Sequence, residues 1–61
     1  MIYYVFVDKA INAVVGVAYE SKDIKKIARR IKRIDKQHAR GHEYAIIEKS
    51  ETGKAALYGT I

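Results

Sequence analysis

One stretch of this sequence, residues 22–40, repeats its apolar residues with the period of an α-helix, and two short β-like runs flank it on each side. The apolar residues follow the i, i+3, i+4, i+7 spacing of a helix that packs against a sheet. They are Ile24, Ile27, Ala28, Ile31 and Ile34. A single helix between two strand pairs restricts the chain to an α+β fold with the element order ββαββ.

The four flanking runs are rich in β-branched and aromatic residues, and polar or glycine-containing turns separate them. Gly16 lies inside the second run, where a glycine is typical of a bulge or of close approach by another segment. The runs predict two hairpins in one four-stranded, mainly antiparallel sheet, with the helix on one face and the strand order left open. We expect the strands at residues 2–7, 13–19, 43–49 and 54–61, joined within the hairpins by 8–12 and 50–53.

Polar and glycine residues mark the two ends of the predicted helix. Ser21 is a residue type that caps free backbone N–H groups, and Asp23 in the first turn complements the helix dipole. Gly41 is able to adopt the left-handed conformation that closes a helix, and His38 and Arg40 precede it, at positions where cations are favoured. The helix is therefore expected from about residue 22 to about residue 39.

The chain has 61 residues and no cysteine, so it forms one domain, residues 1–61, with no disulfide or thiolate zinc site to stabilise it. This size excludes two-domain enzymes, repeat arrays and most cofactor-binding folds. We expect no cofactor. The lack of cysteine favours a reducing compartment. The apolar run at 2–7 is too short for a signal peptide or membrane span, so a cytoplasmic location is expected, including that of an infected cell.

Positive charge is concentrated in the helical segment. The chain has a net charge of +5, and nine of its twelve Lys and Arg residues fall within residues 22–40 together with only two acidic residues. That segment therefore carries +7 and the rest of the chain −2. An ordinary solvated helix mixes the two signs, because like charges four residues apart repel.

A polyanion would relieve this repulsion, so the predicted function is non-enzymatic nucleic-acid binding through phosphate contacts. The alternative is a small inhibitor or adaptor of the kind that viruses encode, binding an acidic surface of a host protein. A membrane surface is disfavoured because the apolar stripe is needed by the sheet. The predicted contact residues, which we name the basic face, are Lys22, Lys25, Lys26, Arg29, Arg30, Lys32, Arg33, Lys36 and Arg40.

Both sides of the first two strands are apolar, although one helix covers only one face of a sheet. We therefore expect a homodimer formed through the second face. The five tyrosines and Phe6 are also compatible with a surface on which bases stack. Strand aromatics are more often core residues, so the basic face is the preferred binding surface.

Two histidines are the candidate catalytic or metal-binding residues. His38 and His42 have i, i+4 spacing, but the predicted helix end separates them, and no third ligand type completes a metal site. A small metal-independent ribonuclease using both as acid and base is the enzymatic alternative. Asp35 lies beside the apolar stripe, and we expect its carboxylate to be satisfied by His38 or by a sheet tyrosine.

Overall fold

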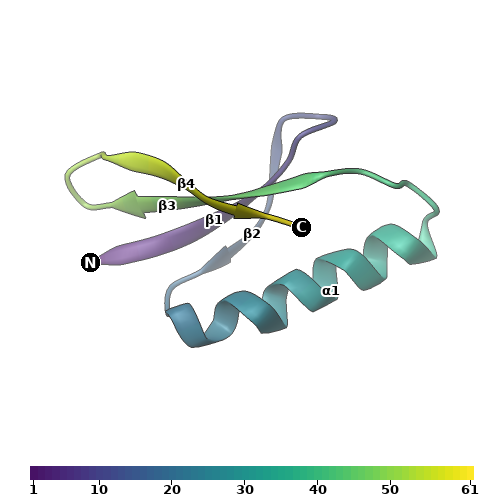
Figure 1. Cartoon of the computed structure of the whole chain (residues 1–61), viewed down its shortest axis with the longest axis horizontal. Helices are drawn as coiled ribbons and strands as arrows, with labels where there is room; N and C mark the ends of the chain where they lie inside the picture. The colour runs from purple at the N-terminus through teal and green to yellow at the C-terminus, as the bar shows by residue number, and fades with distance from the viewer.

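A computed structural model describes residues 1–61. The chain forms one four-stranded antiparallel sheet with the order β2-β1-β3-β4, and a single helix crosses one face of it (Figure 1). The predicted α+β class and ββαββ order are confirmed. The elements are β1 (Ile2–Asp8), β2 (Ala13–Ala18), a 3-10 turn η1 (Ser21–Asp23), α1 (Ile24–Gln37), β3 (Tyr44–Ser50) and β4 (Ala55–Thr60).

The hydrophobic core lies between the helix and the sheet. Phe6 is fully buried at its centre, and Ile46 is its neighbour on β3. Ile24 and Ile31 enter from α1, whereas Ile34 is 41% exposed, so the predicted apolar stripe is covered less completely near its end. The buried cluster consists of Phe6, Ala18, Ile24, Ile31, Tyr44 and Ile46.

Gly16 gives the helix room to approach the sheet. It pairs with Phe6 across β1 and β2, next to a register irregularity between Phe6 and Val7. A Cβ atom at Gly16 would lie 3.2 Å from Cγ2 of Ile27, closer than ordinary van der Waals contact. Of the two interpretations of Gly16, the close approach of another segment is confirmed, and the register irregularity lies beside it.

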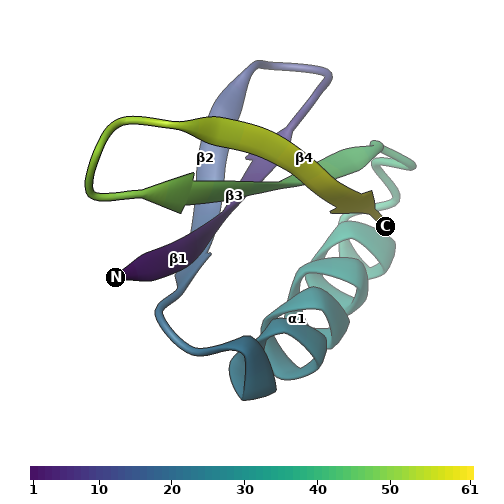
Figure 2. The same ribbon diagram turned by 60° about the vertical axis from the view of Figure 1, so that its left-hand side comes forward.

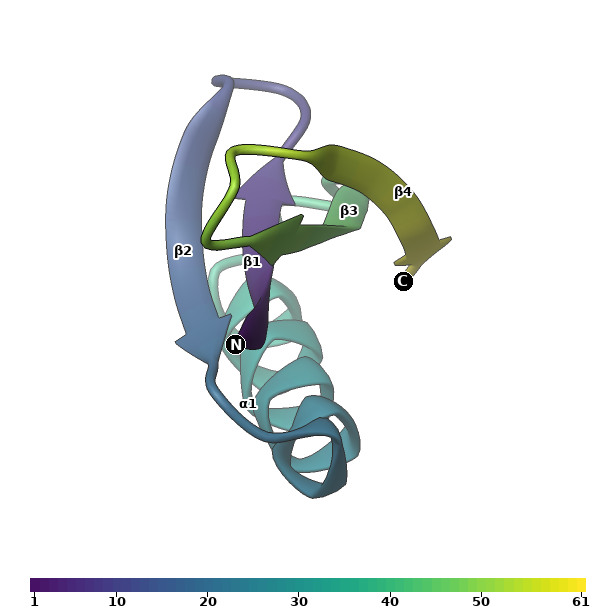
Figure 3. The same cartoon turned by 90° about the vertical axis from the view of Figure 1, so that its left-hand side faces the viewer.

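The opposite face of the sheet has no helix over it (Figures 2 and 3). An aliphatic row crosses this face from one edge strand to the other, because Val5 pairs with Val17 and Ile47, and Ile47 pairs with Leu57. Val5 in the middle of the row is only 6% exposed, but Leu57 on the edge strand β4 is 67% exposed. We name this row, with its surroundings, the open face.

The prediction that Ser21 caps the helix is wrong. Ser21 begins η1, the N-cap position there belongs to Glu20, and no side chain caps either η1 or α1. The N–H of Asp23 instead donates to the carbonyl of Glu20 at 3.0 Å, so a backbone turn begins the helical segment. The tight 3-10 turn satisfies part of the helix start without a side chain.

The prediction that Gly41 closes the helix is also wrong, because α1 ends at Gln37. Ala39 takes the left-handed conformation, with φ 52°, and its N–H donates to the carbonyl of Lys36 at 3.1 Å. The N–H of Arg40 donates to the Asp35 carbonyl, also at 3.1 Å, which completes a Schellman motif. Gly41 has φ +66° in the following loop. Arg40 therefore lies beyond the helix.

Candidate functional site

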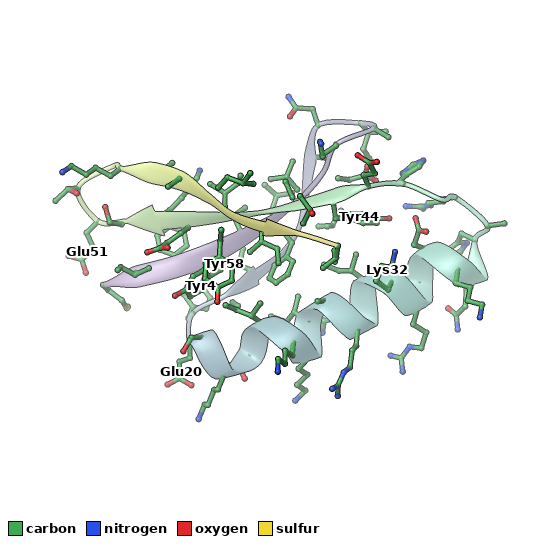
Figure 4. All side chains as sticks on the ribbon, in the orientation of Figure 1. Tyr4, Glu20, Lys32, Tyr44, Glu51 and Tyr58 are labelled. Carbon is green, nitrogen blue, oxygen red and sulfur yellow. The ribbon has the colours of Figure 1, made fainter.

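The basic face lies on the side of the helical segment that points away from the sheet. Seven of its nine residues are on α1, Lys22 is in η1 and Arg40 is in the loop that follows. All nine are exposed, and nitrogen-tipped side chains project from the outer side of α1 in Figure 4. This arrangement follows from the burial of Ile24 and Ile31, which turns the intervening polar residues outward.

The basic face has almost no internal charge compensation. Its single ion pair joins Nζ of Lys22 to a carboxylate oxygen of Glu20 at 3.2 Å. The other eight cations of the face make no salt bridge. By contrast, Lys9 in the β1–β2 connection lies 3.5 Å from Glu43. The acidic residues of the chain are therefore placed away from most of its cations.

Part of the basic face surrounds a shallow hollow of about 380 Å³ on the helix surface. We name it the arginine hollow. Its walls combine four cations with one aliphatic side chain, so an anion lying there would meet several positive groups at once. The lining residues are Lys26, Ile27, Arg29, Arg30 and Arg33.

A second group of polar residues is buried where the helix end meets the sheet, and we name it the polar cluster: Asp8, Asp35, His42 and Tyr44. Asp35 is 7% exposed and accepts three hydrogen bonds, from the Tyr44 hydroxyl at 2.7 Å and from the backbone N–H groups of Gly41 and His42 at 3.2 and 3.1 Å. The sheet tyrosine, not His38, satisfies this carboxylate. Asp35 thereby holds the loop after α1 against β3.

The hydrogen bond between Tyr44 and Asp35 shifts the pKa of both groups. It is the main reason that the pKa of Asp35 lies below its ordinary value, because the hydroxyl stabilises the ionised carboxylate against the opposing effect of burial. The same bond, helped by burial, raises the pKa of Tyr44 to about 12. At neutral pH the pair therefore consists of a carboxylate and a neutral phenol.

Asp8 and His42 form the other half of the polar cluster. Asp8 is fully buried, and its carboxylate oxygens contact Nδ1 of His42 at 2.8 Å and the N–H of Ala10 at 2.9 Å. Burial acts to raise the pKa of Asp8, but these hydrogen bonds outweigh it and hold that pKa below its ordinary value. An ionised carboxylate only accepts hydrogen bonds, so Nδ1 of His42 carries the hydrogen.

The two histidines lie in different environments. His38 is exposed at the C-cap position of α1, whereas His42 is held by Asp8, and no hydrogen bond joins the two. No group of three or more His, Cys, Asp or Glu side chains is arranged to hold a metal ion. None of the helical segments has the length and apolarity needed to cross a lipid bilayer.

The sequence pattern places Asp8 in a turn and does not indicate that Asp8 and His42 are partners. One signal was present: Tyr4, Phe6 and Asp8 alternate along β1, so Asp8 continues the side of the strand that faces the core. A carboxylate on that side requires a partner. The partner, His42, lies 34 residues away in the sequence, so no local spacing of residues could predict the contact.

Comparison of the chain with protein-family models, with curated proteins and with solved structures found no match.

Proposed function

We propose that this chain is a non-enzymatic nucleic-acid-binding protein that contacts phosphates through the basic face. The observation that supports the proposal best is the lack of internal partners, since eight of the nine exposed cations make no salt bridge. Side chains whose charges serve only folding are normally mixed in sign or paired. A phosphate backbone would supply the missing counter-charge.

The repulsion between like charges on the basic face supports the same proposal. Four like-charged i, i+4 pairs lie within α1: Lys25 with Arg29, Lys26 with Arg30, Arg29 with Arg33, and Lys32 with Lys36. At roughly 0.2–0.5 kcal/mol for each pair, the repulsion amounts to about 1–2 kcal/mol at low salt. This is a large penalty for a 61-residue domain. Binding of a polyanion would remove it.

Salt dependence is the test of phosphate contact. The affinity for mixed-sequence duplex and single-stranded oligonucleotides is measured by fluorescence anisotropy from low to physiological salt. We expect log K to fall linearly with log salt, with a slope of about −0.9 for each phosphate that the protein neutralises on duplex DNA. Absence of binding at low salt, or an affinity indifferent to salt, would reject the proposal.

An acidic protein surface is the competing partner for the basic face, as expected of an inhibitor or adaptor of the viral type. A nuclease-treated pull-down from native lysate separates the two. Recovery of one stoichiometric acidic protein that survives nuclease treatment would favour the inhibitor. The loss of all bound material after nuclease treatment is the result expected for a nucleic-acid-binding protein.

The proposal assigns no catalytic role to the histidines. Nε2 of His42 makes no hydrogen bond within the chain, whereas Nδ1 donates to Asp8, so the ribonuclease alternative has a defined test. The purified chain is assayed on RNA beside its His38→Ala and His42→Ala variants. No RNA cleavage is expected from any of the three proteins, and cleavage abolished by either substitution would make the protein an enzyme.

We also propose that two copies associate through the open face. The aliphatic row there has no covering element, while the basic face lies on the opposite side of the sheet. Association by the open face would therefore bury apolar area and keep the two positively charged helices apart. Leu57→Lys is expected to give a monomer by analytical ultracentrifugation. Ile11→Lys, at a residue that is also exposed and lies in the β1–β2 connection, is the control that should leave a dimer.

A further inference from the structure

An exposed aromatic ring adjoins the basic face at the start of the helical segment. Tyr19 follows the last residue of β2, and its side chain is 65% exposed. Its ring centroid lies 6.2 Å from that of Tyr3, which is half-buried and lies on the same side of β1 as Val5, so the ring is supported from the open-face side at the edge of the sheet. The Tyr19 hydroxyl makes no hydrogen bond within the chain. The ring is thus held at the surface without a structural role for its polar end.

Tyr19 lines a hollow of about 560 Å³ together with Lys26, Ile27 and Arg30 of α1. We name it the tyrosine hollow. The arginine hollow is also lined by Lys26, Ile27 and Arg30, so the two hollows adjoin along this part of the helix. Lys26 and Arg33 are seven residues apart, which corresponds to about 10 Å along the helix axis. One surface therefore leads from an aromatic ring to a row of unpaired cations.

The charges at the two ends of this surface differ. Glu20 and Asp23 also line the tyrosine hollow, and Glu20 pairs with Lys22. No acidic residue lines the arginine hollow. A phosphate is consequently favoured at the arginine end, whereas an uncharged planar group is favoured beside Tyr19. This order of groups fits a nucleotide whose base lies on Tyr19 and whose neighbouring phosphates lie along α1 toward Arg33.

We infer that the preferred ligand of the basic face is a single-stranded nucleic acid, with one base stacked on Tyr19 and its backbone on Lys26, Arg30 and Arg33. This inference rests on the proposed function and adds a strand preference to it. Bases in a duplex are stacked on one another and cannot present a face to an aromatic side chain, whereas unpaired bases can. Stacking on aromatic rings tolerates any base, so little sequence preference is expected.

The test compares a single-stranded mixed-sequence oligonucleotide with its duplex, using Tyr19→Ala, Tyr19→Phe and, as the matched control, Tyr58→Ala. Tyr58 is 52% exposed but lines neither hollow. We expect Tyr19→Ala to weaken single-strand binding about 5- to 100-fold and to leave duplex binding unchanged. Tyr19→Phe and Tyr58→Ala should bind like the unmodified chain, and circular dichroism confirms that each variant is folded.

A spectroscopic readout distinguishes stacking from a general loss of affinity. The chain has no tryptophan, so Tyr19→Trp creates a single tryptophan at the site, whose emission is separable from that of the remaining tyrosines. Its emission should be quenched by the single strand and not by the duplex. Absence of quenching, or a loss of affinity in Tyr19→Ala that is equal for both oligonucleotides, would overturn the inference and leave phosphate binding intact. Absence of binding to both oligonucleotides by the unmodified chain would overturn the proposed function as well.

Discussion

The basic face and the polar cluster are both rich in charged groups, but they differ in whether those groups have partners within the chain. In the polar cluster every buried side-chain nitrogen and oxygen atom has a hydrogen-bond partner. On the basic face one cation of nine has a partner within the chain. Paired and buried charges position the end of the helix against the sheet, whereas unpaired and exposed charges are available to another molecule. Each region therefore predicts a different response to substitution.

The largest loss of stability is expected from Asp35→Ala in the polar cluster. It removes the acceptor of three hydrogen bonds and leaves the buried Tyr44 hydroxyl and two part-buried backbone N–H groups without partners. Thermal unfolding followed by circular dichroism measures the effect. Asp23→Ala is the control, since this residue at the helix start caps no N–H group, and it should cost at most about 1 kcal/mol. Equal losses in the two variants would contradict a special role for the polar cluster.

Acid should destabilise the chain through the same carboxylates. The pKa values of Asp8 and Asp35 are lowered in the folded state, so their contribution to stability is present above their ordinary pKa, near 3.8. It is lost as the pH falls below about 4 and through the folded-state pKa values. Urea unfolding between pH 6 and pH 2 checks this, with Asp35→Asn as the comparison. The variant should be less stable at pH 6 and should lose less stability on acidification, and a parallel decline in both proteins would be the contrary result.

Alkali should act on the polar cluster in the opposite sense, through Tyr44. Its pKa is raised to about 12 in the folded state from 10.0, so its contribution is complete below pH 10 and disappears as the pH rises toward 12. Tyr44→Phe removes the titrating hydroxyl. The free energy of unfolding of this variant should be lower at pH 7 and should decline less between pH 9 and pH 12. Tyr58→Phe is the control, because it leaves the other tyrosines in place. Its free energy of unfolding should decline between pH 9 and pH 12 as much as that of the unmodified chain.

A smaller and opposite effect is expected at the helix end, where Ala39 is left-handed with φ 52°. Ala39→Gly removes the steric penalty of that conformation and should stabilise the chain by roughly 0.5–1 kcal/mol after the greater unfolded-state entropy of glycine is included. Chemical denaturation measures the gain. Gln37→Gly, within the last turn of α1, is the control that should destabilise the chain by a similar amount. A loss of stability in Ala39→Gly would mean that Ala39 is not left-handed in solution.

The same contrast explains what could be predicted from the sequence. The element order, the apolar stripe and the basic face depend on residue type and local spacing, so residues 22–40 and the four β-like runs around them were sufficient to predict them. The helix end could not be predicted, because the Schellman bonds end α1 at Gln37 with Ala39, and not Gly41, in the left-handed position that closes it. The pairing of Asp8 with His42 depends on the adjacency of β1 and β3, which no local pattern specified.

The location of positive charge, and not its total, determines the nucleic-acid binding that we propose for this chain. Two triple variants test it most directly. Lys26→Gln, Arg29→Gln and Arg33→Gln neutralise the centre of the basic face, whereas Lys9→Gln, Lys49→Gln and Lys54→Gln neutralise the three basic residues outside it, so each variant has a net charge of +2. Both should remain folded, with stability changes of at most about 0.5 kcal/mol for each substitution, since five of the six residues are exposed and Lys49 is half-buried.

The measurement is the slope of log K against log salt for one oligonucleotide and the two triple variants. We expect the slope of the basic-face variant to fall in magnitude by about 0.7–0.9 for each phosphate contact removed, near 2–3 units in all, and we expect this variant to bind weakly at physiological salt. The other variant should lose less than about one unit. Equal losses of slope and affinity in the two variants would show that net charge alone attracts the nucleic acid, which would contradict the account.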